Sequence, residues 1–169
     1  MGKSKKTKGA KVAIRVGKTV SGLQSFNDAV SKCAEIKDAL KPGLSALKGS
    51  SKVVRVANTK LIDGSVDIDE AVRDKYPEDS RWDYVVGYAN EAFFIEVHPA
   101  ATSNVDEMVN KVKWLKDWLA SSASDLRKLH KKDVYYWVPS GRVSILKGSV
   151  QDRKIAANHL MIKNPIILP

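Results

Sequence analysis

The apolar residues between positions 104 and 119 repeat with helical spacing. They form one stripe: Val105, Met108, Val109, Val112, Leu115 and Leu119. Apolar residues that recur every three or four positions occupy one face of an α-helix. Ser103 or Asn104, just before the stripe, has the type of side chain that caps a helix N-terminus. The pattern predicts an amphipathic helix that ends at Leu119.

Three shorter stretches also have helical patterns. Residues 25–40 carry apolar side chains at similar spacing, and Pro42 and Gly43 then stop the predicted helix. Residues 68–76, which end at Pro77, and residues 151–160 predict two further short helices. These stretches and the 104–119 helix supply the helical part of an α/β domain.

Strand patterns occur between the predicted helices. Residues 82–88 and 92–98 are rich in aromatic and β-branched side chains, and the short segment between them has the length of a hairpin connection. Further strands are predicted at these positions: 52–57, 135–138 and 143–146. Asp63 and Gly64 predict a turn between elements. The alternation of strands and helices indicates an α/β fold class.

Length and composition predict one domain behind a basic tail. The 169 residues, with 43% hydrophobic and 28% charged positions, suit one globular unit. We expect a flexible basic tail over residues 1–20 and a single α/β domain over residues 21–169. No membrane-spanning run or apolar signal core is present, so we expect a cytoplasmic protein. Cys33, the only cysteine, has no partner for an internal disulfide or a thiolate zinc site.

Charge is distributed unevenly along the chain. The formal net charge is +10, and seven basic residues lie between Lys3 and Lys18. Residues 63–83, the acidic island, hold eight acids against three bases, whereas residues 127–163 hold nine bases against two acids. Phosphates attract Lys and Arg and release counterions when neutralised. We therefore expect nucleic acid as a partner, with carboxylates near the acidic island as candidate ligands of a cation.

The predicted hairpin brings Asp83, Glu96 and His98 together. Residues two apart on a strand share a face, so Glu96 and His98 point the same way. The start of one hairpin strand lies beside the end of the other, which places Asp83 near both. Two carboxylates and a backbone carbonyl, such as that of Val97, are oxygen ligands that Mg²⁺ prefers. The three residues thus form a candidate site for Mg²⁺ or Mn²⁺.

The order of these elements resembles the PD-(D/E)XK nuclease superfamily. The resemblance runs from the 25–40 helix through the strand near Val54, the strand WDYVVGY with Asp83 and the strand AFFIEVH with Glu96. It continues through the 104–119 helix to the strand near Tyr135. The resemblance implies a restriction-endonuclease-like core, in which helices flank a central mixed sheet.

The same resemblance implies a chemistry and a set of metal ligands. Asp83 and Glu96 would bind the metal, and Glu35 of the first helix would add a carboxylate. The metal would polarise the scissile phosphate of DNA or RNA and lower the pKa of an attacking water. The implied activity is metal-dependent phosphodiester hydrolysis.

The sequence departs from the superfamily pattern at two positions. His98 occupies the place where these nucleases usually have a lysine, and an imidazole stabilises negative charge less well than an ammonium. Lys111 or Lys113 of the following helix would have to substitute. Trp82 stands before Asp83 where a proline is usual.

These departures leave other functions open. A non-catalytic nucleic-acid-binding or protein-interaction module on a nuclease-like fold would use the basic tail and the C-terminal Lys and Arg residues as its partner surface. A third alternative is a subunit of a larger complex that docks through the acidic island, and a homodimer is also open. Asp83, Glu96 and His98 also fit structural roles, such as ending a strand or pairing with a nearby lysine.

Overall fold

A mixed five-stranded sheet organises residues 24–169, the part of the chain that the computed structural model describes. In spatial order the strands are β2 (Ile62–Asp67), β3 (Tyr84–Tyr88), β4 (Glu91–His98), β5 (Tyr135–Pro139) and β6 (Leu160–Ile162). β2, β3 and β4 are antiparallel neighbours, whereas β5 and β6 run parallel to β4. The predicted α/β class is confirmed. The predicted tail over residues 1–20 lies outside the described residues.

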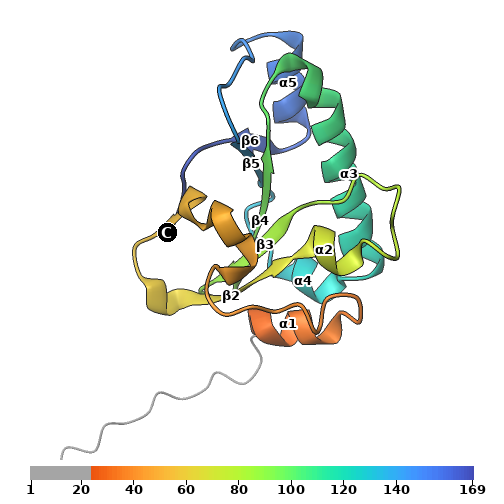
Figure 1. The fold of residues 1–169 in the computed structure, drawn as a ribbon, viewed down its shortest axis with the longest axis vertical. Helices are drawn as coiled ribbons and strands as arrows, with labels where there is room; N and C mark the ends of the chain where they lie inside the picture. Colours follow the sequence, from red (N-terminus) through yellow and green to blue (C-terminus); the bar gives the residue numbers. More distant parts are fainter. Residues whose placement is uncertain (1–23) are drawn as a thin grey trace, which may run out of the picture.

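Helices cover one face of the sheet. They are α1 (Phe26–Lys32), α3 (Val105–Ser121), α4 (Ser124–Lys128) and α5 (Val150–Ala157). Their buried apolar side chains form one core with those of this sheet face, and Figure 1 shows α3 running alongside the sheet. The short helix α2 (Ile68–Val72) follows β2 and packs on β3. No helix in residues 24–169 is both long enough and apolar enough to cross a membrane.

A second, smaller core covers the opposite face. It involves the 3₁₀ segment η1 (Ser45–Val53) and a separate parallel pair of strands, β1 (Val54–Val56) and β7 (Ile166–Leu168). Two more 3₁₀ turns, η2 (Thr59–Leu61) and η3 (Thr102–Asn104), precede β2 and α3. The strand predicted near Val54 therefore exists, but it lies outside the five-stranded sheet.

The β3–β4 hairpin closes through a two-residue turn at Ala89 and Asn90. Both residues have positive φ, 51° and 58°, which is the backbone of a type I′ turn. The Asn90 side-chain oxygen accepts the Phe26 backbone N–H at 3.2 Å, so the start of α1 is attached to the turn. The predicted hairpin is confirmed, and its turn fixes the register that brings the start of β3 beside the end of β4.

Several sequence predictions about local structure are wrong, and the helices predicted over residues 68–76 and 151–160 end early, at Val72 and Ala157. Asp63 and Gly64 form a bulge inside β2 instead of a turn, and Gly64 has φ 149° with space for no side chain beside Leu40. Residues 143–146 form no strand. The helix predicted over residues 25–40 ends at Lys32, because Cys33 has an extended backbone and the chain then turns. Ile36 still enters the core from that turn.

Gly87 of β3 lies directly against the ring of Phe26. A Cβ atom there would lie 2.3 Å from Cγ of the fully buried Phe26. We expect Gly87→Ala to lower the free energy of unfolding by about 2 kcal/mol, because the ring has to move within a packed core. Urea denaturation measures the effect, with Gly49→Ala as control because nothing lies within 4 Å of a Cβ at Gly49. Equal stability of the two variants would contradict this packing.

Candidate functional site

Asp83 and Glu96 face each other across the β3–β4 pair. Tyr84 pairs with Ile95, so Asp83, just before β3, lies opposite Glu96. The Asp83 backbone N–H donates to Glu96 Oε2 at 2.8 Å, and the Val97 backbone N–H donates to Asp83 Oδ2 at 3.0 Å. One oxygen of each carboxylate is thereby held by the backbone of the other strand. The second oxygen of each, Asp83 Oδ1 and Glu96 Oε1, faces the side chain of Lys111.

Lys111 of α3 places its ammonium where the two carboxylates converge. Its Nζ lies 2.6 Å from Glu96 Oε1 and 3.9 Å from Asp83 Oδ1, and it donates a hydrogen bond of 2.8 Å to the Arg81 carbonyl oxygen. All three neighbouring atoms are oxygens. The arrangement places one ammonium against two carboxyl groups beneath α3.

Burial raises the pKa of both carboxylates. Glu96 is only 1% exposed, and desolvation, reinforced by the negative charge of Asp83, raises its pKa to about 8 despite the neighbouring Lys111. Desolvation also raises the pKa of Asp83, against the lowering influence of Lys111 and of the Val97 N–H. Two carboxylates this close, one buried and one half-buried, favour a bound cation, because a cation stabilises their ionised forms.

His98 extends the cluster towards the N-terminal part of α3. Its Nε2 lies 3.0 Å from Glu107 Oε2, and its Nδ1 lies 4.0 Å from Glu96 Oε1. Glu107 and Lys111 are four residues apart on α3 and therefore share a helix face. The structure thus brings Asp83, Glu96, His98 and Lys111 together, and it adds Glu107.

Two residues proposed from the sequence do not join this cluster. The Glu35 carboxylate pairs with Lys75 at 2.5 Å and accepts the Trp118 indole N–H at 2.7 Å. Trp118 lies two turns beyond Lys111 on α3, a rise of about 10 Å, so Glu35 is bound elsewhere on the molecule. Lys113 is exposed and lies two positions from Lys111, on a different face of the helix.

The donor set fits a divalent cation only if Lys111 moves. Among residues 24–169, no group of three or more His, Cys, Asp and Glu side chains is arranged to hold a metal ion. Mg²⁺ is often bound through one or two carboxylates and completes its shell with water and phosphate oxygens, at about 2.0–2.1 Å. Asp83 Oδ1 and Glu96 Oε1 offer two such oxygens, but the Lys111 ammonium lies between them.

Much of the acidic island is paired within the chain. Asp69 binds Arg73 and Arg81 through its two oxygens. Lys48 contacts Asp67 at 3.2 Å and Glu70 at 2.5 Å. These pairs leave fewer free carboxylates for docking on a basic partner than the sequence alone indicates.

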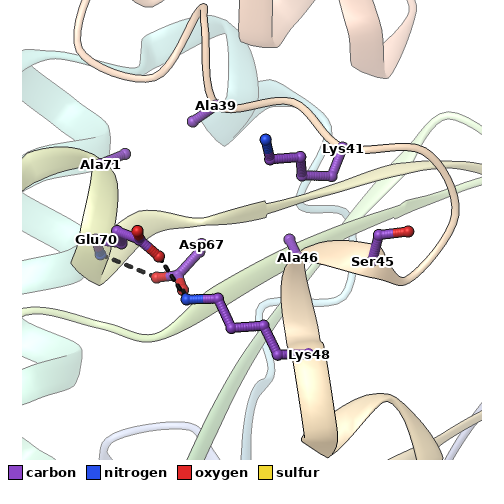
Figure 2. Close-up of a pocket in the computed structure, with 8 residues that line it drawn as sticks. All are labelled: Ala39, Lys41, Ser45, Ala46, Lys48, Asp67, Glu70 and Ala71. Carbon is purple, nitrogen blue, oxygen red and sulfur yellow. Dashed lines mark hydrogen bonds and ion pairs between the residues drawn. The ribbon is translucent and has the colours of Figure 1, made fainter.

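Lys48, Asp67 and Glu70 line a cavity of about 370 Å³ (Figure 2). Asp67 shares a face of β2 with Ser65, whose hydroxyl accepts the backbone N–H of Ala46 in η1. The cavity therefore lies on the η1 side of the sheet, whereas the Asp83–Glu96 pair lies on the α3 side.

Sequence reasoning missed Glu107 and left Lys111 and Lys113 as equal alternatives, although the helix period held the signal. Lys111 lies three positions after Met108 and four before Leu115, so it falls on the apolar stripe that faces the sheet. A charged residue on a buried stripe indicates a partner inside the protein. Glu107, one turn earlier, was indistinguishable from an ordinary acid in the first turn of a helix.

Comparison with known proteins gives no match. No protein-family model matches the sequence, and no curated protein and no solved structure matches the chain. Its function therefore has to be inferred from the geometry and chemistry of the site.

Proposed function

We propose that this protein is a metal-dependent nuclease that hydrolyses phosphodiester bonds of DNA or RNA at Asp83, Glu96 and Lys111. One observation carries the proposal: one oxygen of each of the two carboxylates is directed at a single cation, the Lys111 ammonium. Carboxylates fixed in this way by backbone N–H groups are preorganised for a cation with oxygen preference, such as Mg²⁺ or Mn²⁺, that takes the place of the ammonium.

The order of the structural elements supports a restriction-endonuclease-like core. The main elements follow in the order α1, β2, β3, β4, α3 and β5, with the short helices α2 between β2 and β3 and α4 between α3 and β5. β2, β3 and β4 are antiparallel neighbours, and β5 runs parallel to β4. Asp83 stands just before β3 and Glu96 near the end of β4. β2 takes the place that the sequence resemblance gave to the strand near Val54. This order agrees with the resemblance to the PD-(D/E)XK superfamily.

The residues of the site would have different roles in hydrolysis. Asp83 Oδ1 and Glu96 Oε1 would hold the metal, which supplies Lewis acidity towards the phosphate and a lowered pKa of the attacking water. Lys111 carries the positive charge closest to both carboxylates. Once displaced from Glu96, its ammonium would stabilise negative charge that develops on the phosphate.

Cleavage assays test the proposal. Single- and double-stranded DNA and RNA are incubated with the protein and Mg²⁺, Mn²⁺ or EDTA, and the products are separated on denaturing gels. We expect cleavage with at least one of the metals and none with EDTA. Absence of cleavage of all four substrates with either metal would overturn the nuclease proposal.

A second function, nucleic-acid binding without cleavage, is favoured by a different observation. Glu96 is almost fully buried, and both of its oxygens already have partners, in the Asp83 N–H and the Lys111 ammonium. Both oxygens of Glu96 are thus satisfied within the protein without a metal. Binding without cleavage, with an affinity that falls steeply as salt rises, is the result expected for this function. No binding at low salt would exclude both functions.

A further inference from the structure

The 140–149 loop, between β5 and α5, lies against the end of β4 that carries the site. The Ser140 backbone N–H donates to the His98 carbonyl oxygen at 3.2 Å, and the Ser144 backbone N–H donates to the Ala100 carbonyl oxygen at 2.8 Å. The Trp137 indole N–H also donates to the His98 carbonyl oxygen, at 3.1 Å. The loop is therefore attached to the chain two and four residues beyond Glu96.

The tip of this loop is a hydrogen-bonded turn that exposes apolar side chains. The Ser149 N–H donates to the Leu146 carbonyl oxygen at 3.2 Å, and the Gly148 N–H donates to Asp152 Oδ2 at 2.7 Å. Leu146 is nevertheless 77% exposed, and Val150, at the first position of α5, is 66% exposed. Val143 in the same loop is 42% exposed. Apolar side chains held in water by an ordered turn indicate a contact surface.

The charge of the loop indicates which partner this surface fits. Arg142 and Lys147 are both exposed, and residues 140–149 contain no Asp or Glu. Asp152, just beyond the loop, already accepts the Gly148 N–H. Cations beside a protruding aliphatic side chain match a polyanion that also offers apolar faces. A nucleic acid combines these features, because its phosphates surround stacked bases.

We propose that the 140–149 loop is a nucleic-acid contact in which Leu146 packs against or between bases while Arg142 and Lys147 bind backbone phosphates. The proposal rests on the nucleic-acid substrate of the proposed function and adds the surface that holds it beside the site. An anionic membrane surface shares this chemistry, but membrane binding generally uses a larger apolar face than one turn offers.

Binding to labelled 20-nucleotide DNA, single- and double-stranded, tests the loop by fluorescence anisotropy across a salt series. We expect Arg142→Ala/Lys147→Ala to weaken binding by at least about 10-fold and to reduce the slope of log K against log salt by about 2 for duplex DNA. Leu146→Ser is expected to weaken binding by about 10-fold with an unchanged slope, because it removes an apolar contact and no charge.

Lys60→Ala/Lys131→Ala is the matched charge control. Lys60 precedes Leu61, whose carbonyl oxygen accepts the Ala89 N–H, and Lys131 contacts Glu91, so both lysines lie at the hairpin end of the sheet. This control lowers the net charge by the same amount as the loop variant. We expect it to bind like the natural protein, and an equal loss of affinity in both double variants would overturn a specific role for the loop.

Two further measurements distinguish failure of the loop proposal from failure of the nuclease proposal. Hydrolysis of bis(p-nitrophenyl) phosphate, a small diester without bases, reports on the site alone and should be unchanged in the loop variants. Loop variants that bind DNA normally would overturn the loop proposal even if the protein is a nuclease. Loop variants that lose binding would support it even if no diester is hydrolysed. If Leu146→Ser weakened binding to phosphatidylserine vesicles but left DNA binding unchanged, the loop would be a membrane contact and the nucleic-acid proposal would be wrong.

Discussion

Asp83→Asn and Glu96→Gln are each expected to lower metal-dependent cleavage by at least about 100-fold. Each substitution replaces the anionic oxygen that faces Lys111 while keeping a carbonyl-type oxygen to accept the backbone N–H from the opposite strand. The pair of strands should therefore keep its geometry while the affinity for a divalent cation falls. The rate of oligonucleotide cleavage at saturating Mn²⁺ and its dependence on metal concentration are the quantities to measure.

Asp74→Asn is a suitable control for these variants. Asp74 is an exposed acid of the acidic island, in the turn after α2, and its removal changes the net charge equally. We expect the control to cleave at the natural rate. Cleavage by the Asp83 or Glu96 variant at the same rate as by the Asp74 variant would remove both carboxylates from the mechanism.

Lys111→Met is expected to destabilise the protein, and more strongly at alkaline pH. The substitution keeps the aliphatic stem but removes the ammonium from Glu96 and from the Arg81 carbonyl oxygen. We expect the free energy of unfolding to fall by about 1–2 kcal/mol at pH 6. At pH 9 the loss should reach about 3 kcal/mol, because a buried carboxylate then lacks its partner.

The sign of this pH dependence follows from Glu96. The pKa of Glu96 is raised to about 8 in the folded protein, above its value in the unfolded chain. The unfolded chain therefore loses the proton first, and the free energy of unfolding falls as pH rises from the unfolded pKa towards pH 8. In the Lys111→Met variant the pKa of Glu96 rises further, so the free energy of unfolding continues to fall above pH 8. In the natural protein Glu96 is already ionised there and causes no further loss. Urea denaturation at pH 6 and pH 9 measures the difference.

Two variants make this test specific. Lys113→Met, an exposed position of the same helix, should change stability by less than about 0.5 kcal/mol at both pH values. Glu96→Gln/Lys111→Met should lose the additional destabilisation at pH 9, since the buried group no longer ionises. If Lys111→Met lowered the free energy of unfolding equally at pH 6 and pH 9, the ammonium would not stabilise the ionised form of Glu96.

Part of the candidate site can be predicted from the local sequence pattern alone. The apolar stripe of residues 104–119 and the β3–β4 hairpin are encoded by neighbouring residues, because helix period and turn chemistry act over a few positions. The hairpin then fixes which side chains share a face, so the placement of Asp83 beside Glu96 was predicted before any tertiary contact was known. The stripe also held the signal that distinguishes Lys111 from Lys113.

The remaining features depended on contacts between distant segments. β2 was not predicted, because Asp63 and Gly64 have turn chemistry, and only pairing with β3 holds them as a bulge. Residues 143–146 are β-branched in part, yet no neighbouring strand pairs with them. Glu35 was assigned to the metal on the premise of a long first helix, which instead ends at Lys32.

The sequence by itself determined the α/β class, the long amphipathic helix, the hairpin and the pairing of its two carboxylates, because each depends on local periodicity. Only the tertiary structure decided that an ammonium from α3 lies between those carboxylates and that Glu35 is bound to Lys75, 40 positions further along the chain. It also decided that the 140–149 loop is hydrogen-bonded to His98 and Ala100 at the end of β4. Such placements depend on how helices rotate and dock on the sheet, which residue spacing along the chain does not specify.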